Sequence, residues 1–240
     1  MSHPTAPSPR AWRAVLERIE ADLLSGLVAP GDRLPPEREL AATLQVGRSS
    51  VREALRVLEV MGLIRTGTGS GPTSGAIVVA TPHGGMAQLL RLQVAAQGFS
   101  IADVVQTRLV LERWAAGELA SDRVRTDRGL GAVREMLATM AADLPVDDFL
   151  ALDARFHLAL VEAAGNAVIT AAMAGLRTAI EEYVRSGSRR LSDWRATATR
   201  LIAEHAGIVA AIEDGDADLA RTLVNDHITD YYAAAGFGGA

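Results

Sequence analysis

Sequence typical of β-strands is confined to one short stretch of this 240-residue chain, residues 63–79. There, Leu63-Ile64 and Ile77-Val78-Val79 flank a glycine-rich segment, a pattern that predicts a β-hairpin with a long glycine-rich tip. The remaining periodic segments have the apolar spacing of helices. Aromatic residues make up only 4% of the chain and alanine is abundant, which also favours helices over sheets. The sequence therefore predicts a mainly α fold that contains one small hairpin.

Three helices are predicted before the hairpin. Apolar residues at helical spacing predict the first helix over residues 12–25. A second, short helix begins at Pro36, where the missing N–H of proline costs nothing, and runs to about Leu44. The tight turn Gln45-Val46-Gly47 separates it from a third helix over about residues 48–61. The first part of the chain is therefore expected to contain three helices followed by a β-hairpin.

The rest of the chain follows a linker at residues 81–85 and shows helical patterns throughout. The predicted helices cover residues 86–97, 100–120, 127–142, 147–164, 167–187, 192–213 and 216–235. Glycine, proline or asparagine separates most of them. The expected organisation is a tail (1–9), a helix-turn-helix domain (10–80), the linker (81–85), a helical domain (86–235) and a tail (236–240).

Composition indicates where the protein works and which kinds of site it lacks. The chain has no cysteine, so disulfide bonds and thiolate metal sites are excluded, and a reducing compartment fits. No stretch approaches the roughly 18 unbroken apolar residues of a membrane span. The segment Met1–Arg10 has three prolines and no apolar run, unlike a signal peptide. We therefore expect a cytoplasmic protein.

Charge is unevenly distributed along the chain. Residues 1–80 carry nine arginines and eight acids, a net charge of +1, whereas residues 81–240 carry fifteen arginines and twenty-one acids, a net charge of −6. Six arginines fall between Arg33 and Arg65. A locally basic segment on an acidic protein suits a DNA-binding domain attached to a domain with another role.

The helix predicted over residues 48–61 divides its side chains between two faces. Val51, Ala54, Leu55 and Leu58 form an apolar face that can pack on the preceding helix. Ser49, Arg52 and Arg56 lie opposite, and Arg48 stands at the N-terminal end. Arginine can donate two hydrogen bonds to guanine, so this polar face suits entry into the major groove of DNA. The alternative is an amphipathic helix with a solvated cationic face.

The wider sequence around this helix resembles the winged helix-turn-helix of the GntR family. The resemblance covers about residues 10–80 and is carried by PGDRLPPERELA from Pro30, VGRSSVREALR from Val46, and Leu58 with Gly62-Leu63-Ile64. It implies DNA contacts by Arg38 before the turn, by Arg48, Ser49, Ser50 and Arg52 on the recognition helix, and by Thr68 and Gly69 at the wing tip. The family usually has Ser or Thr where Gly47 stands, and its wing is usually shorter.

Three of the five histidines, His157, His205 and His227, fall in predicted helices. Asp153 precedes His157 by four residues, so both side chains share one helix face. The other two histidines lie on the last two helices, which Asp214-Gly215 joins as a hairpin. One carboxylate and three imidazoles suit zinc, nickel, iron or cobalt, and the oxygen ligand adds manganese. The alternative is a set of core histidines with ordinary hydrogen bonds.

The sequence around these four residues is similar to the FCD sensor domain of the FadR subfamily. The motifs are DARFH from Asp153, AGN from Ala164, Glu204-His205, Gly215-Asp216, Ala220, His227-Ile228, and Arg108 with Leu111-Glu112, and the similarity covers about residues 86–235. It implies an antiparallel bundle of six or seven helices, a metal on the Asp and three His, and a small organic acid that meets the metal and an arginine.

The effector residues implied by this similarity are Arg108, as the carboxylate-binding arginine, and Asn166, as part of the cavity lining. Each has a structural alternative: Arg108 could be a surface or helix-stabilising arginine, and Asn166 could be a helix C-cap.

These features predict a homodimeric, ligand-responsive transcriptional regulator, expected to be a repressor, that binds palindromic operator DNA. The principal rival is a metalloenzyme with an accessory DNA-binding domain. Catalysis would need a general base beside the metal-bound water, and the sequence offers no paired carboxylates or nucleophile for it. Glu204 should point away from its neighbour His205. A constitutive architectural DNA binder is a third reading, but it leaves the helical domain without a purpose.

Overall fold

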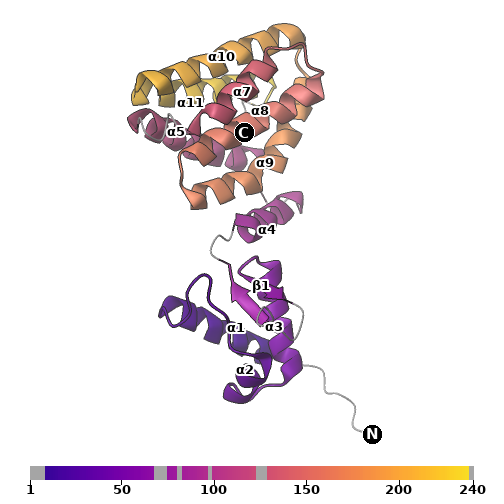
Figure 1. The fold of residues 1–240 in the computed structure, drawn as a ribbon. Coiled ribbons are helices and arrows are strands. Elements are labelled where there is room, and N and C mark those ends of the chain that lie inside the picture. Colours follow the sequence, from indigo (N-terminus) through magenta and orange to yellow (C-terminus); the bar gives the residue numbers. More distant parts are fainter. Residues whose placement is uncertain (1–8, 68–74, 80–82, 97–98, 123–128, 238–240) are drawn as a thin grey trace. The chain divides into compact units, whose positions relative to one another are not determined.

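The computed structural model describes residues 9–67, 75–79, 83–96, 99–122 and 129–237. It divides the chain into two compact units, Met1–Met86 and Ala87–Ala240, which are described separately below (Figure 1). Helix α4 (His83–Ala95) begins inside the predicted linker, three residues earlier than expected. Two glycines occupy its first turn, where they interrupt a helix less than they would in its middle.

The first unit contains three helices and a hairpin. They are α1 (Pro9–Leu24), α2 (Glu37–Thr43), α3 (Arg48–Val60), β1 (Ile64–Gly67) and β2 (Gly75–Val78). Helix α3 packs on both α1 and α2. Buried side chains from all three helices and from both strands form one apolar core, with Val15, Val51 and Ala54 fully buried. The predicted winged helix-turn-helix fold is confirmed.

The turn between α2 and α3 depends on one left-handed residue. Gln45 adopts a positive φ of 53°, the only such non-glycine value among the described residues. The amide of Val46 then donates a hydrogen bond of 3.1 Å to the carbonyl oxygen of Ala41. This tight reversal carries the chain directly from α2 into the N-terminus of α3.

The hairpin is antiparallel and has a third segment along one side. Its register runs from the pair Ile64–Val78 to the pair Gly67–Gly75. Arg33 forms an isolated antiparallel bridge with Ile77, which the sequence did not predict. The turn that precedes α2 is therefore joined to β2. The predicted wing tip, including Thr68 and Gly69, lies outside the described residues.

The second unit is an all-α bundle. Besides α4 it contains α5 (Ile101–Ser121), α7 (Gly131–Met140), α8 (Val146–Ala163), α9 (Ala167–Ser188), α10 (Trp194–Asp214) and α11 (Ala217–Ala234). The seven helices of the described part agree with the predicted bundle of six or seven. Most of their ends lie within two residues of the predicted ones, but α7 begins four residues later, at Gly131.

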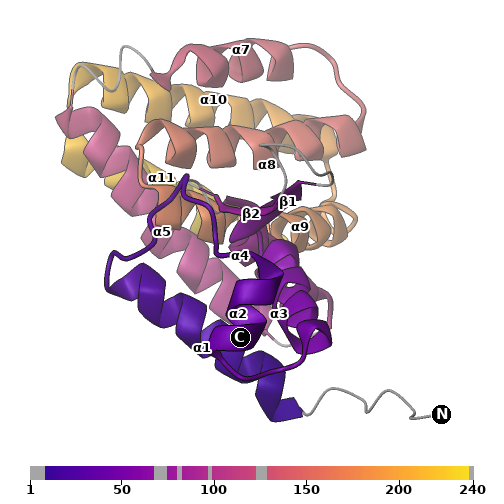
Figure 2. The same cartoon turned by 60° about the horizontal axis from the view of Figure 1, so that its bottom comes forward.

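Helix pairing in this unit places α5 beside α11 and α8 beside α9, and α10 and α11 run side by side as a hairpin (Figures 1 and 2). Gly215 ends α10 with a φ of 80°, a left-handed value that favours glycine, and Asp216 then caps α11 through the amide of Leu219. Large apolar side chains such as Phe156, Leu119, Ile180 and Ile208 are fully buried between the helices. No helix in the described ranges has the length and apolar character that a membrane span requires.

Candidate DNA-binding surface and metal centre

Helix α3 turns its charged face outward. Val51, Ala54, Leu55 and Leu58 are buried, as the spacing predicted. Arg48, Ser49, Arg52 and Arg56 are exposed. The surface of α3 is shallowly hollowed along Ser49, Arg52 and Arg56. Three guanidinium groups on one exposed helix face offer donors for phosphates and for base edges.

Arg38 lies outside this face, on α2, whereas Arg52 belongs to it. Arg38 on α2 is exposed. Arg52 makes an ion pair of 3.3 Å with Glu37, and the side chains are 67% and 40% exposed to solvent. An exposed pair of this kind contributes little stability, so Arg52 can exchange Glu37 for DNA at small cost.

Ser50 differs from the other predicted contact residues on α3. Only 3% of it is exposed, and it lies on the inner side of α3 with Ala54 and Leu58, four and eight residues later. A side chain at this position faces the core, which argues against the predicted contact with DNA. Gly47 is the N-cap of α3 and supplies no side-chain hydrogen bond, as expected from the absence of a hydroxyl.

The four predicted metal ligands lie together in the second unit. Asp153 and His157 come from α8, His205 from α10 and His227 from α11. All four are buried, and one ligand atom from each lies within 4.8 Å of the others. The spacing of four residues on α8 and the α10–α11 hairpin thus bring one carboxylate and three imidazoles to one point.

The distances among these atoms fit a single ion. The Nε2 atoms of His157 and His227 are 3.1 Å apart, and those of His205 and His227 are 3.2 Å apart. Oδ1 of Asp153 lies 3.2 Å from Nε2 of His205 and 3.8 Å from Nε2 of His157. Ligands held at about 2.0–2.1 Å by a tetrahedral ion lie about 3.3 Å from one another. The observed set is close to that value.

Two glutamates fix the orientation of two of the rings. Oε2 of Glu112 lies 2.5 Å from Nδ1 of His157, and Oε2 of Glu204 lies 2.8 Å from Nδ1 of His227. A carboxylate only accepts hydrogen bonds, so each Nδ1 donates its proton. The neutral rings therefore present unprotonated Nε2 atoms to the centre of the cluster, the form that binds a metal.

The electrostatics of the cluster favour neutral imidazoles beside an ionised carboxylate. Burial, together with the nearby His205, lowers the pKa of His227 to about 3, and burial also lowers the pKa of His205. Burial alone would raise the pKa of Asp153, but the neighbouring His157 and His205 hold it below its usual range. His205 and His227 are thus neutral at neutral pH and lie beside the anionic oxygen of Asp153.

Arg108 lies in the same buried region and is not a surface residue, whereas the helix-stabilising alternative stays open, because Arg108 pairs with Glu112 four residues later on the same helix. It is 3% exposed, and its Nε donates a hydrogen bond of 2.5 Å to Oε1 of Glu112. Its Nη2 is buried and makes no hydrogen bond of good geometry among the described residues. The buried hydroxyl of Tyr232 lies close enough to Arg108 for a hydrogen bond between the two to act on the pKa of Tyr232. Nη2 is therefore a buried donor beside the cluster with capacity for a further acceptor.

Asn166 is an N-cap, not the C-cap expected as its structural alternative. Its Oδ1 accepts hydrogen bonds from the amides of Val168 and Ile169 at the start of α9. This role uses the side-chain oxygen fully. Its predicted place in the lining of the effector cavity remains a prediction.

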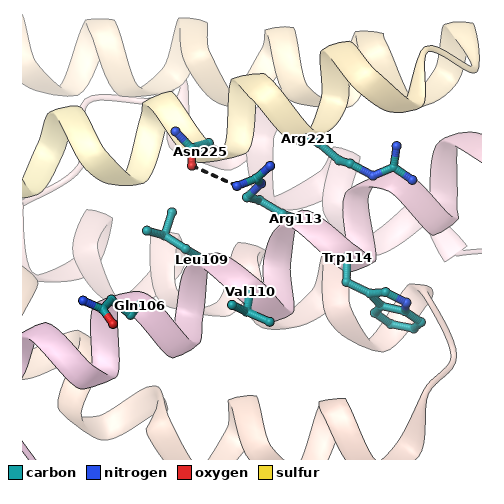
Figure 3. A pocket seen from close by; sticks show the side chains of 7 residues that line it. All are labelled: Gln106, Leu109, Val110, Arg113, Trp114, Arg221 and Asn225. Atoms are coloured by element: carbon teal, nitrogen blue, oxygen red, sulfur yellow. Dashed lines mark hydrogen bonds between the residues drawn. The ribbon is translucent and has the colours of Figure 1, made fainter.

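A separate groove lies between α5 and α11 (Figure 3). Gln106, Leu109, Val110 and Trp114 line it from α5, and Arg113 approaches Asn225 across it at 3.5 Å. Arg221 covers Gly117, where a Cβ atom would lie 2.3 Å from its Nε. None of the four metal-ligand candidates lines this groove, so it is a feature of the outer surface and not the opening of the metal site.

Sequence reasoning gave no role to Glu112, Arg200 or Glu204, although they surround the cluster. The available signal was their spacing: Arg108–Glu112 and Arg200–Glu204 are both arginine–glutamate pairs four residues apart on helices of the predicted site. Spacing along one helix does not reveal which histidine of another helix such a glutamate meets.

A chain that combines an exposed cationic recognition helix with a separate helical domain around a buried ligand cluster is a two-domain DNA-binding regulator. It belongs to the gntR family of bacterial regulatory proteins, which it matches over residues 12–73, and its second domain is an FCD domain, matched over residues 103–230. The chain is thus a transcriptional regulator that binds operator DNA, and the enzyme alternative is not supported.

Several relatives cover nearly the whole chain. A protein of Escherichia coli (strain K12), provisionally named as the L-lactate dehydrogenase operon regulatory protein, is 28% identical over 90% of this chain and 82% of its own length. The transcriptional repressor NanR of Cronobacter sakazakii is 29% identical over 94% and 86%. The solved structure of Streptococcus agalactiae GntR shares the fold, with a TM-score of 0.56 and 22% identity over 91% of this chain and 96% of that one.

Proposed function

We propose that this regulator is an effector-responsive repressor whose sensor domain binds a divalent metal ion through Asp153, His157, His205 and His227. The observation that carries the proposal is the meeting of three buried Nε2 atoms with one carboxylate oxygen at separations that suit one ion. Unprotonated nitrogens this close repel one another unless a cation lies between them. The ion would act as a Lewis acid that anchors the effector, and as part of the fold.

The donor set favours zinc, which takes nitrogen and oxygen ligands in tetrahedral geometry. Nickel, iron and cobalt also accept imidazole, and the carboxylate keeps manganese as an alternative. Separations near 3 Å fit the adjacent positions of an octahedral ion as well, so competition among these metals in solution must decide the identity.

The charges at the site favour an anionic effector. Among the buried groups, Asp153 and Glu112 contribute two negative charges and Arg108 one positive charge, a sum of −1. A divalent ion changes this sum to +1, which one carboxylate would neutralise. The Nη2 of Arg108 offers that carboxylate a charge-assisted hydrogen bond. We therefore propose a small organic acid held between the ion and Arg108.

The DNA-binding part of the proposal uses the exposed residues Arg38, Arg48, Ser49 and Arg52, together with Thr68 and Gly69 at the wing tip. A single helix-turn-helix domain contacts too little DNA for strong binding, and palindromic operators require a second copy related by twofold symmetry. The working form is therefore a homodimer. Effector binding would shift its two helix-turn-helix domains between spacings that fit the operator and spacings that do not.

The test is operator binding by the metal-loaded protein with and without small carboxylic acids. L-lactate is the first acid to try, because the name of the E. coli relative refers to an L-lactate dehydrogenase operon. We expect one acid of the series to change operator affinity at least several-fold, and Arg108→Gln to abolish that response. An affinity for DNA that no acid alters would overturn the sensing role.

A further inference from the structure

Two histidines of the proposed metal site, His157 and His227, each donate a hydrogen bond from Nδ1 to a glutamate on a neighbouring helix, and each glutamate also pairs with an arginine. On α5, Arg108 donates to Oε1 of Glu112 at 2.5 Å, and Oε2 of Glu112 accepts from Nδ1 of His157 at 2.5 Å. All three side chains are at most 3% exposed. We call each such arginine–glutamate–histidine series an arm, and this first arm is buried inside the bundle.

The second arm repeats the arrangement closer to the surface. On α10, Nη1 of Arg200 donates to Oε1 of Glu204 at 2.5 Å, and Oε2 of Glu204 accepts from Nδ1 of His227 at 2.8 Å. The side chains of Arg200 and Glu204 are 38% and 25% exposed, whereas that of His227 is 3% exposed. The arm therefore leads from the outer face of α10 to a buried ring on α11.

His205, the third histidine, has no such support. Its Nδ1 is buried and has no hydrogen-bond partner among the described residues. Glu204 is its immediate neighbour in sequence but serves the ring of the adjacent helix. Helix α10 thus gives the site one direct ligand and one carboxylate that orients a ligand of α11.

We infer that Glu204 is a positioning residue for metal binding, with Arg200 as its anchor. By accepting the proton of Nδ1, Glu204 holds His227 in the tautomer whose Nε2 electron pair faces the other ligands, and it fixes the plane of the ring. The inference rests on the proposed metal site. Metal binding would then require Glu204 in addition to the four ligands.

The experiment compares Glu204→Ala, Glu204→Gln and a control, Glu213→Gln, in the full-length protein. Glu213 lies on the same helix and pairs with Arg134 at 2.7 Å in an exposed ion pair outside the metal site. Zinc affinity is measured by competition with a chromophoric chelator. The tautomer of His227 is read in the metal-free protein from the ¹⁵N shifts of labelled histidine rings.

We expect Glu204→Ala to weaken zinc binding by about 10- to 100-fold and to let His227 populate the Nε2–H tautomer. Glu204→Gln keeps an acceptor oxygen, so it should preserve the tautomer and lose less affinity. Glu213→Gln should bind zinc as the wild type does. A merely structural role for Glu204 would lower the melting temperature without moving the tautomer.

Unchanged affinity and an unchanged His227 tautomer in folded Glu204→Ala would overturn the positioning role while leaving the metal site intact. If the wild type binds no zinc, nickel or manganese, the proposed metal site itself is wrong, and this inference falls with it. Should Glu204→Ala fail to fold, Arg200→Ala decides: an affinity equal to that of the wild type would count against the arm.

Discussion

Nε2 of His157 lies 3.1 Å from Nε2 of His227, although neither atom carries a proton while both rings are neutral. The protons are held on the opposite side of each ring, by Glu112 and by Glu204. Two nitrogen electron pairs therefore face each other in a buried space. A hydrogen bond cannot form between them without a third proton, whereas a metal ion would satisfy both. This relationship is the observation on which the proposed metal centre rests.

Replacement of Arg52 by alanine should weaken specific operator binding by about 1–3 kcal/mol if Arg52 contacts a base. The side chain is exposed on α3, and its pair with Glu37 is weak. Electrophoretic mobility shift or fluorescence anisotropy assays at several salt concentrations measure the effect, and wild-type binding should fall steeply with salt.

Two other variants serve as controls for Arg52→Ala. Arg185→Ala removes a partly exposed arginine of the sensor domain, which pairs with Asp147, and should leave DNA affinity unchanged. Ser50→Ala should also retain operator binding, because Ser50 faces the core. Wild-type affinity in folded Arg52→Ala would contradict the assignment of α3.

Two glycine-to-alanine variants should have opposite effects on stability. A Cβ at Gly175 on α9 would lie 2.8 Å from Cβ of Leu90 on α4, so Gly175→Ala should destabilise the protein by about 1–2 kcal/mol. A Cβ at Gly207 on α10 would lie 3.8 Å from Cδ1 of Leu223, an ordinary contact. Gly207→Ala should therefore stabilise its helix by about 0.5–1 kcal/mol. Urea unfolding of both variants checks this; equal effects would show that α4 does not pack closely on α9.

The tyrosines should ionise at higher pH in the folded protein than in the unfolded chain. Burial raises the pKa of Tyr231, whose hydroxyl donates to the carbonyl oxygen of Val184 at 2.6 Å, and burial also raises the pKa of Tyr232 and Tyr183. Because the folded pKa values exceed the unfolded value of about 10, this contribution to stability is complete below pH 10 and is lost as the pH rises further.

Phenolate absorbance during an alkaline titration tests this expectation. Only Tyr183, the least buried of the three, should ionise before unfolding, and Tyr183→Phe should remove that early change. Three equivalent ionisations near pH 10 in the folded state would show that Tyr231 and Tyr232 are not buried.

Much of the fold could be predicted because periodicity and breakers are local. The apolar spacing of α3 identified its buried face, and Asp214-Gly215 marked the α10–α11 hairpin. The burial of Ser50 follows from its spacing from Ala54 and Leu58, which places it inward, whereas the family resemblance implies a DNA contact there. The bridge between Arg33 and Ile77 could not be predicted, since a strand edge recruits a segment through backbone groups that leave no side-chain pattern.

The candidate metal site could also be predicted only in part. Residue type and helix register predicted that Asp153, His157, His205 and His227 would lie together, and they do. The glutamates behind His157 and His227 were not predicted, because these contacts join residues 45 and 23 positions apart on different helices. Such pairings depend on how the helices rotate against each other, which one sequence does not determine.

The most direct test of the account is elemental analysis of the wild-type protein, purified without chelator or affinity-tag metal and then offered zinc, nickel and manganese. We expect one ion per chain. The ion should stabilise the folded state by about 2.7 kcal/mol at a free metal concentration 100 times the Kd, and so raise the melting temperature. A variant with His227→Ala should lose both the ion and this rise in melting temperature. If the wild type binds none of the three metals at stoichiometric level, and the melting temperatures of wild type and His227→Ala respond alike to metal, the four residues are core side chains and the proposed sensing mechanism is wrong.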